Sequence, residues 1–202
     1  MSVNRPELIQ SIATALSKDG VATSDFDLNP ELKLPANRVL RPAAVLVPIT
    51  LVGGQAEIFL TKRSAHLRHH PGQIAFPGGK QDAGDPTLTD AALRESEEEI
   101  GLPRGIVDIL GELPPHETVT SFRVTPIVGW LTQDFDAIAE AGEVSEVFRV
   151  PLAHLADPAN YRIESRIWQG QRRYFFTVPY GPYYVWGATA RMLRSLADRM
   201  TT

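Results

Sequence analysis

The chain has 202 residues, 43% of them hydrophobic and 22% charged, which suits one well-packed globular domain. Its net charge of −4 argues against a protein that coats nucleic acid, because such a protein needs an excess of lysine and arginine. The absence of cysteine excludes disulfides, thiolate zinc sites and a cysteine nucleophile, and it is compatible with a reducing cytoplasm.

The first predicted element is a helix over residues 5–18, where apolar residues recur at helical spacing. These residues also carry charges around short apolar stretches, so we expect neither a signal peptide nor a membrane anchor, and we expect a cytoplasmic protein. A loop rich in Asp, Asn and Pro follows to about residue 37. We therefore predict an N-terminal helix-and-loop extension over 1–37 and a main domain over 38–202, within one globular unit.

The next predicted elements are two strands, at 43–49 and 56–61, joined as a hairpin through Gly53 and Gly54. Residues 63–86 read as loop around a short apolar piece at 74–76.

A helix is expected over residues 88–100, with Thr87 as its N-cap, Asp90 completing a capping box and Gly101 ending it. Further strands are predicted at 106–111, 123–131, 144–150 and 173–178, and a last helix at 186–200. The chain shows no internal repeat, and the pattern predicts a single mixed α/β domain with helices flanking a mixed sheet.

Three carboxylates share one face of the helix at 88–100. At ~100° per residue, Glu95, Glu98 and Glu99 fall within a sector of about 100°. The opposite side carries Leu93, Ser96 and Ile100, which we expect to face the core, while Glu97 and Asp90 point to water. Ala91 and Ala92 are small enough for another backbone to approach closely.

A solvated acidic surface is the simplest explanation of such a run, but two physical points argue against it. Glu95 and Glu99 form a like-charge i,i+4 pair, which destabilises a helix by a few tenths of a kcal/mol. The three carboxylates also lie near the C-terminal end of the helix, where its dipole disfavours negative charge. Arg94 is the only basic residue of the helix. A bound cation would neutralise this arrangement, and hard oxygen ligands suit Mg²⁺ or Mn²⁺.

A glycine turn precedes the helix at residues 76–80. Glycine lets the backbone pass close to a helix face or a ligand without a Cβ clash. A carbonyl of this turn, with Gly79 as the candidate, could complete the shell of a metal ion.

With these residues in view, the chain resembles the Nudix hydrolases. Gly79, Asp85 and the run from Arg94 to Leu102 follow the family's box of a glycine, an acidic residue and the sequence Arg-Glu-aliphatic-x-Glu-Glu-x-Gly-aliphatic. Asp85 stands where the family has Glu, one extra residue precedes Arg94, and Ser96 occupies a normally aliphatic position.

The first two departures are shared by one subfamily, the coenzyme A pyrophosphatases. Residues 60–64 and 67–79 resemble that subfamily's added signature, and the likeness covers roughly residues 40–195. One difference lies at Ser121, where the subfamily usually has glycine. The resemblance implies a mixed β-sheet sandwiched between helices, with the chemistry on a loop–helix–loop.

The resemblance also implies roles for the box residues. Glu95 and Glu99 are the preferred metal ligands and Glu98 the third, and any of them could instead orient the attacking water. Arg94 is expected to pair with a box carboxylate, the alternative being a surface pair with Glu98. Asp85 either binds an outer metal ion or helps to cap the helix. The candidate catalytic residues are thus Glu98, Arg94 and Glu95, and the candidate metal ligands are Glu95, Glu99, Glu98 and Gly79.

Further roles follow from the implied chemistry, in which divalent cations neutralise pyrophosphate oxygens and a carboxylate accepts the proton of the attacking water. Glu143 and Glu146 are candidates for an additional glutamate from a downstream loop. The candidate substrate-binding residues are Lys62, Arg63, Arg68, His70 and Gln73. The aromatic residues Trp186, Tyr183 and Tyr184 are expected in the core more than in a ligand platform.

The leading hypothesis is therefore a hydrolase that cleaves coenzyme A or its derivatives into 3′,5′-ADP and a phosphopantetheine product. The alternatives are a Nudix hydrolase of another substrate, such as NADH or ADP-ribose, and a non-catalytic nucleotide sensor. The expected partner is a small molecule, with neither nucleic acid nor membrane. A homodimer is an assembly that the sequence allows.

Overall fold

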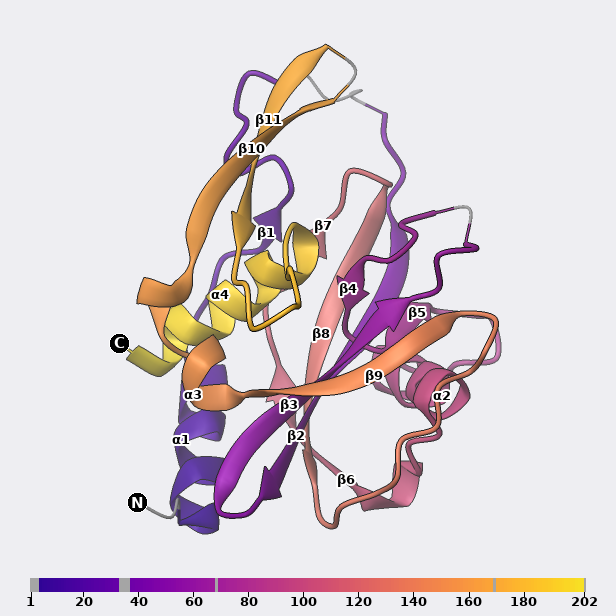
Figure 1. The fold of residues 1–202 in the computed structure, drawn as a ribbon, viewed down its shortest axis with the longest axis vertical. Coiled ribbons are helices and arrows are strands. Elements are labelled where there is room, and N and C mark those ends of the chain that lie inside the picture. Colours follow the sequence, from indigo (N-terminus) through magenta and orange to yellow (C-terminus); the bar gives the residue numbers. More distant parts are fainter. Residues whose placement is uncertain (1–3, 33–36, 68, 169, 202) are drawn as a thin grey trace.

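The computed structural model describes residues 4–32, 37–67, 69–168 and 170–201. Within them, nine strands form one mixed sheet, and helices cover both of its faces (Figure 1). The mixed α/β class predicted from the sequence is confirmed.

Three long strands make the centre of this sheet. β2 (Arg41–Val52) runs parallel to β8 (Phe122–Leu131) and antiparallel to β3 (Gln55–Arg63). The predicted hairpin is present: Val52 pairs with Gln55, and Gly53 and Gly54 between them have φ angles of 57° and 81°. Both glycines adopt the left-handed conformation that a tight hairpin turn needs.

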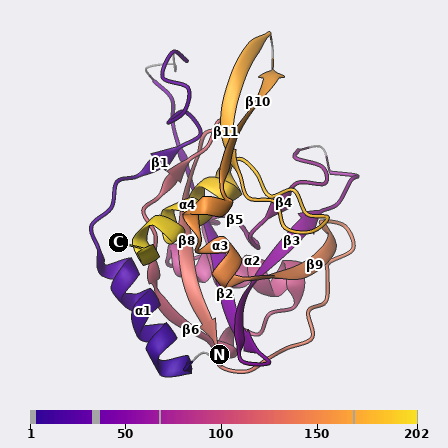
Figure 2. The same ribbon diagram turned by 60° about the vertical axis from the view of Figure 1, so that its left-hand side comes forward.

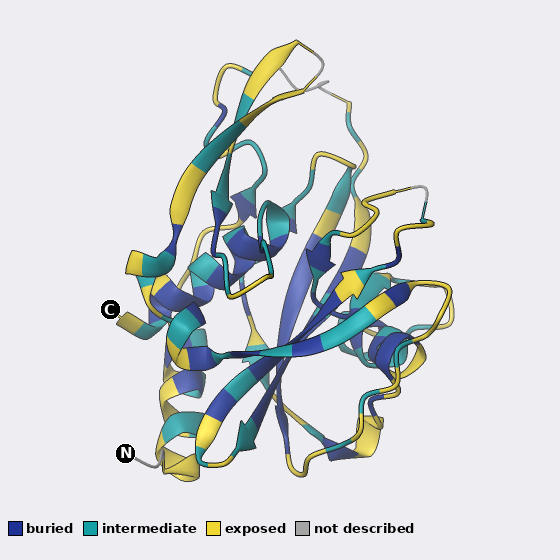
Figure 3. Cartoon of the chain, viewed as in Figure 1, coloured by how far each residue is buried: buried dark blue, intermediate teal, exposed yellow. Residues whose placement is uncertain are grey.

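β2 is buried on both faces, which explains its continuous apolar run. Ala43, Val47 and Ile49 face one hydrophobic cluster, whereas Ala44 and Leu46 face a second cluster on the other side. The burial map shows this strand passing through the interior (Figure 3).

The remaining strands of the sheet are shorter or lie further out. β6 pairs with β8, β9 with β3, β5 with β2, and β1 with β7. Their bounds are β1 Thr23–Ser24, β4 Ile74–Ala75, β5 Gly78–Lys80, β6 Val107–Glu112, β7 His116–Glu117 and β9 Val144–Pro151. The expectation that residues 63–86 are loop throughout was wrong. Within this range, β4 pairs with β3 and β5 pairs with β2, although both strands are short.

The helices divide between the two faces. α2 (Leu88–Ile100) packs against β2 and β5 and covers the smaller cluster. α1 (Arg5–Ser17), α3 (Leu152–Leu155) and α4 (Ala188–Thr201) cover the larger cluster on the other face (Figure 1). The predicted bounds of the first and last helices agree with α1 and α4 to within two residues.

A two-stranded antiparallel ribbon stands apart from the main sheet. It consists of β10 (Arg162–Trp168) and β11 (Gln171–Thr177), and it rises beyond the rest of the molecule (Figure 2). The sequence predicted β11, but β10 was missed because charged residues interrupt its apolar positions.

A buried histidine fixes the segment that follows α1 to the sheet. His116 is fully buried; its Nδ1 lies 2.8 Å from the Thr23 hydroxyl, and its Nε2 lies 3.1 Å from a carboxylate oxygen of Asp25. These contacts accompany the short β1–β7 pairing. Residues 19–32 are therefore tied to the sheet, not only to α1.

Candidate active site

The helix that carries the carboxylates begins and ends where its capping residues predict. The Thr87 hydroxyl accepts a hydrogen bond from the Asp90 backbone N–H at 3.1 Å. Gly101 has a left-handed φ of 70°, and its N–H bonds to carbonyls of the last turn. The capped ends hold the helix in register with the turn before it.

One side of α2 faces the sheet closely. Its buried residues are Ala91, Ala92, Ser96, Glu99 and Ile100. The expectation that Leu93 lies on the core stripe was only partly right, since Leu93 is partly buried and Ala91 and Ala92 take the tightest positions against β2. Ser96 fits this interior because its hydroxyl donates to the Ala92 carbonyl at 2.7 Å.

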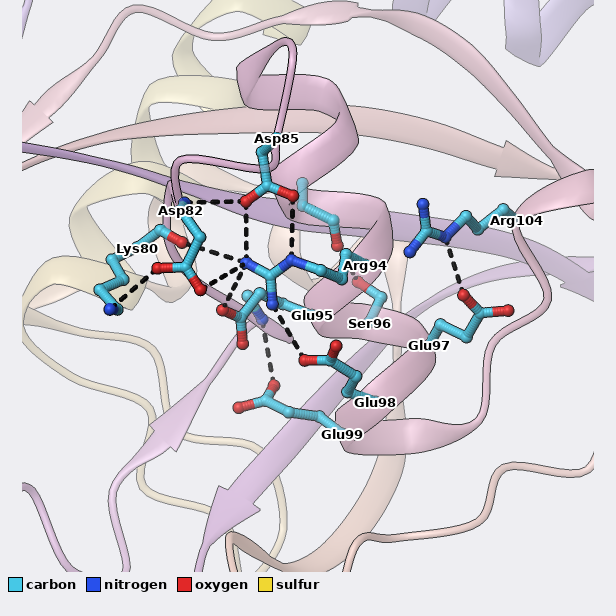
Figure 4. Close-up of polar contacts among 12 residues, drawn as sticks. Lys80, Asp82, Asp85, Arg94, Glu95, Ser96, Glu97, Glu98, Glu99 and Arg104 are labelled. Carbon is cyan, nitrogen blue, oxygen red and sulfur yellow. Dashed lines mark hydrogen bonds and ion pairs between the residues drawn. The ribbon is translucent and has the colours of Figure 1, made fainter.

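Arg94 donates hydrogen bonds to several of the polar residues around it (Figure 4). Its Nε and Nη2 each donate to one oxygen of Asp85 at 2.9 Å, a bidentate pair. Arg94 also donates to Glu95 at 3.0 Å, to Glu98 at 2.9 Å and to the Lys80 carbonyl at 3.3 Å. Arg94 is therefore more than a surface i,i+4 partner of Glu98.

Of the two roles expected for Asp85, helix capping is taken by Thr87, and binding of an outer metal ion stays a prediction. The Asp85 carboxylate receives Arg94 and the Asp82 backbone N–H, while Thr87 caps the helix. The hydrogen bonds from Arg94 lower the pKa of Asp85 to about 2, and the same contacts raise the pKa of Arg94. Both groups stay charged across the neutral range.

Glu99 is the buried carboxylate of the three, with 5% of its surface exposed. Gly78 donates its backbone N–H to Oε2 of Glu99 at 3.1 Å, and Nη1 of Arg63 lies 3.9 Å from Oε1. Burial raises the pKa of Glu99 to about 7, against the opposing effects of Gly78 and Arg63. The role of Gly78 as a donor was not foreseen, although the Gly-Gly pair marked a close backbone approach.

Glu95 lies against the other glycine of the turn. A Cβ atom on Gly79 would come within 2.6 Å of the Glu95 carboxylate, so only glycine leaves this space free. Partial burial is the main cause that raises the pKa of Glu95, whereas the charge and the hydrogen bond of Arg94 lower this pKa. Glu98, by contrast, has 60% of its side chain exposed and points towards Arg94.

The two downstream candidates differ in their surroundings. The Glu143 carbonyl accepts the Ser64 backbone N–H at 2.7 Å, next to Arg63, and the charge of Glu143 contributes to the raised pKa of both Glu95 and Glu99. Glu146 instead accepts a hydrogen bond from the Tyr183 hydroxyl at 2.6 Å, and the Tyr183 ring stacks on Phe148. Tyr183 thus packs within the fold, as expected.

The candidate substrate-binding residues are distributed around the β3–β4 connection. Arg63 adjoins Glu99, and its backbone N–H bonds to the Gln73 carbonyl at 2.9 Å. His70 has a left-handed φ of 54°, and partial desolvation followed by the charge of Arg63 lowers its pKa. Lys62 is exposed and pairs in register with Glu146. The expectation for Arg68 lies outside the described residues.

A divalent cation would find two side-chain ligands here. Glu95 and Glu99 flank the Gly78–Gly79 backbone, and the space beside Gly79 is one that a Cβ would fill. In the described part of the chain, no group of three or more His, Cys, Asp or Glu side chains is arranged to hold a metal ion. The two carboxylates beside the glycine turn fit a hard cation such as Mg²⁺, which proteins bind through one or two carboxylates together with water and substrate oxygens.

Comparison with known proteins agrees with this geometry. The family model described as the NUDIX domain matches residues 40–168. Proteins from Enterobacter sp. (strain 638) and Escherichia coli O157:H7 (strain EC4115 / EHEC), both named uncharacterized Nudix hydrolase NudL, are 43% identical over 157 residues. Each match covers 78% of this chain and 81% of the relative.

Solved structures show the same fold. The MutT protein from Methanosarcina mazei Go1 aligns with a TM-score of 0.52 and 20% identity, over 83% of this chain and 96% of that one. A MutT/nudix family protein from Enterococcus faecalis aligns with a TM-score of 0.52 and 14% identity, over 100% of this chain and 76% of that one. Among the described residues, no helix is long and apolar enough to cross a membrane.

Proposed function

The chain belongs to the Nudix hydrolase family, and from this membership we propose that it cleaves the diphosphate of coenzyme A or a coenzyme A derivative. The products are 3′,5′-ADP and 4′-phosphopantetheine or its acylated form. The coarser activity is that of the family, hydrolysis of nucleoside diphosphate derivatives. The coenzyme A specificity is the proposal.

The proposal rests on the position of the residues that resemble the coenzyme A pyrophosphatases. Residues 60–79, which resemble the coenzyme A pyrophosphatases, run directly past the buried carboxylate. Within this stretch Arg63 lies 3.9 Å from Glu99 and Gly78 donates to it. A substrate diphosphate placed at the carboxylates would therefore lie beside Arg63. We propose Lys62, His70 and Gln73 of the same stretch as further substrate contacts.

The metal roles follow from the same contacts. We assign Glu95, Glu99 and the Gly79 carbonyl as ligands of Mg²⁺ or Mn²⁺, the ions that such hard oxygen donors prefer. When bound, the cation supplies positive charge for the diphosphate oxygens and lowers the pKa of water. Arg94 holds Glu95 in place, and Asp85 holds Arg94.

Proton transfer requires a carboxylate that is accessible to water. Glu98 and Glu143 are both exposed, so both are candidates to accept the proton of the attacking water. We favour Glu143 over Glu146, because Glu146 already accepts the Tyr183 hydroxyl.

The test is a substrate panel. Purified protein is incubated with Mg²⁺ or Mn²⁺ and with coenzyme A, NADH or ADP-ribose, and the products are separated by chromatography. We expect coenzyme A to be cleaved with the highest kcat/KM. Much faster cleavage of NADH or ADP-ribose would reject the coenzyme A assignment and favour another nucleoside diphosphate substrate.

A pair of variants tests the metal assignment in the same assay. Glu99→Gln should lose most of the activity, whereas Glu97→Gln should retain it, because Glu97 faces water and pairs with Arg104. Full activity in Glu99→Gln would remove Glu99 from the metal site.

A further inference from the structure

The β10–β11 ribbon carries two arginines directly opposite each other on one face. Arg166 and Arg173 are cross-strand partners in its antiparallel register. Two like charges in this position destabilise a strand pair. A ribbon that keeps them gains stability when an anion lies between them.

Protein carboxylates do not supply that anion. Within the described residues, neither Arg166 nor Arg173 forms an ion pair, and Nε of Arg173 is buried without a hydrogen-bond partner. Glu164, on the same face, already accepts hydrogen bonds from Tyr184 at 2.7 Å and from Thr177 at 3.2 Å. Arg166 is exposed and Arg173 partly buried, so the charges of the two guanidinium groups are not paired with a carboxylate of the described residues.

Aromatic rings flank the arginine pair. Arg173 lies over the Trp168 ring at 4.0 Å from its centroid, and Arg166 lies over the Trp186 ring at 4.9 Å. Stacking fixes the planes of the guanidinium groups. Trp168 is 48% exposed, whereas Trp186 also contacts the Phe175 ring at 5.1 Å between centroids. Planar guanidinium forks bind phosphate in bidentate fashion, and indole rings stack on nucleobases.

This face is connected to the carboxylate site through Gly187. Gly187 follows Trp186, and the position of a Cβ on it lies 3.7 Å from Nε2 of Gln73. Gln73 in turn bonds through its carbonyl to Arg63, which adjoins Glu99. The Thr189 hydroxyl also donates to the Ile74 carbonyl, so the base of the ribbon is held next to β4.

We propose that the ribbon face formed by Arg166, Arg173, Trp168 and Trp186 binds the phosphorylated purine nucleoside end of the substrate. The arginines bind the phosphomonoester, and an indole stacks on the base. This inference rests on the proposed function, because coenzyme A carries a 3′-phosphate on its adenosine that NADH and ADP-ribose lack. The ribbon then selects for that phosphate, while the carboxylate helix performs the cleavage.

The test measures binding of the product, so it does not depend on cleavage. Calorimetry of the full chain with Mg²⁺ compares 3′,5′-ADP, 5′-AMP and inorganic phosphate. We expect 3′,5′-ADP to bind at least tenfold more tightly than 5′-AMP, and inorganic phosphate to bind weakly. In the double variant Arg166→Gln, Arg173→Gln this preference should disappear.

Arg172→Gln is the matched control. Arg172 belongs to the same strand and has the same charge, but it pairs with Ile167 on the opposite face of the ribbon. It should leave the preference unchanged. Should the double variant fail to fold, Arg166→Gln alone makes the comparison, because Arg166 is exposed and its loss cannot disturb the core.

The proposal would be overturned by equal affinity of the wild type for 3′,5′-ADP and 5′-AMP, or by an unchanged preference in the arginine variants. Equally tight binding of inorganic phosphate would overturn the nucleotide assignment. Failure of the proposed function gives a different result, namely absence of coenzyme A cleavage by the wild type. In the active enzyme, the double variant should reduce the kcat/KM ratio of coenzyme A to 3′-dephospho-coenzyme A about tenfold.

Discussion

At the scale of single residues, the two adjacent glycines of the turn have different tasks. A Cβ on Gly78 would lie 2.5 Å from the Ala44 carbonyl oxygen and from Cα of Val45, both backbone atoms of β2. A Cβ on Gly79 would meet only the end of the Glu95 side chain. The first glycine permits the fold, and the second permits the position of a carboxylate.

This difference predicts a loss of activity in one alanine variant and a loss of stability in the other. Gly79→Ala should reduce kcat/KM on the preferred substrate by ~100-fold through displacement of Glu95, with little change in melting temperature. Gly78→Ala should destabilise the protein by about 2 kcal/mol or more, because the backbone cannot move aside and its φ is 146°. Kinetics and thermal melts of both variants check this. Equal loss of stability in the two would contradict it.

Glu99 predicts a dependence of stability on pH in metal-free protein. Its pKa is raised from 4.5 to about 7 in the folded state, so folding favours the protonated form. The contribution of protonated Glu99 to the free energy of unfolding is fully present below about pH 4.5, and it is lost as the pH rises through about 7. The charge of Arg63 opposes this rise in the pKa of Glu99, whereas the charges of Glu95 and Glu143 add to it.

Glu99→Gln removes the charge and keeps the shape. In the presence of a chelator at pH 8, this variant should be more stable than the wild type, on the order of 2 kcal/mol. The difference should vanish near pH 4.5, and Mg²⁺ should stabilise the wild type alone. Urea denaturation across this pH range measures it. A wild type whose stability rises from pH 5 to 8 relative to the variant would refute the expectation.

At the scale of elements, Arg94 ties the loop before α2 to the helix through ion pairs with Asp82 and Asp85. Asp85 holds Arg94 in bidentate contact, and Arg94 holds Glu95. Asp85→Asn should lower activity 10–100-fold, as is typical when the partner of a ligand-orienting group is lost. The matched control is Asp90→Asn on the same helix, which affects only the cap at Thr87. Wild-type kcat/KM in Asp85→Asn would show that the loop needs no such tie.

The turn between β7 and β8 contains a departure from the subfamily's pattern. Ser121, where the subfamily usually has glycine, has a left-handed φ of 63°. Glycine adopts this conformation without the steric penalty of a Cβ, so Ser121→Gly should stabilise the protein by up to about 1 kcal/mol. Ser121→Ala keeps the Cβ and should give no gain. Urea midpoints of the two variants decide the matter, and a lower midpoint for the glycine variant would contradict the steric explanation.

At the scale of the whole molecule, the sequence predicted the elements whose periodicity is strong. The capped α2 was expected with its observed bounds, and the strands of the hairpin from β2 to β3 were expected one to three residues too short at each end. Apolar patterns and capping residues are local signals. β4 and β5 were missed because they exist only through pairing with β3 and β2. β10 was missed because it packs on no core and shows no apolar period.

The candidate site likewise has features that local sequence patterns predict and features that depend on distant residues. Helical spacing brought Glu95, Glu98 and Glu99 to one sector, but it could not distinguish the buried Glu99 from the exposed Glu98. That distinction depends on β2 and the glycine turn, which lie far from the helix in sequence. The ties of His116 to Thr23 and Asp25 likewise depend on distant partners. The division at residue 37 stays a prediction.

The parallel pairing of β2 with β8 has a consequence for how the chain folds. Partners in this register, such as Arg41 with Phe122 and Ile49 with Trp130, lie roughly eighty residues apart. The loop that must close to form them contains β3, the glycine turn and α2. Such distant contacts form slowly, because the entropy of the whole loop is lost before the pairing stabilises it. On a ribosome, the carboxylate helix would therefore emerge well before the strand that completes the sheet around it.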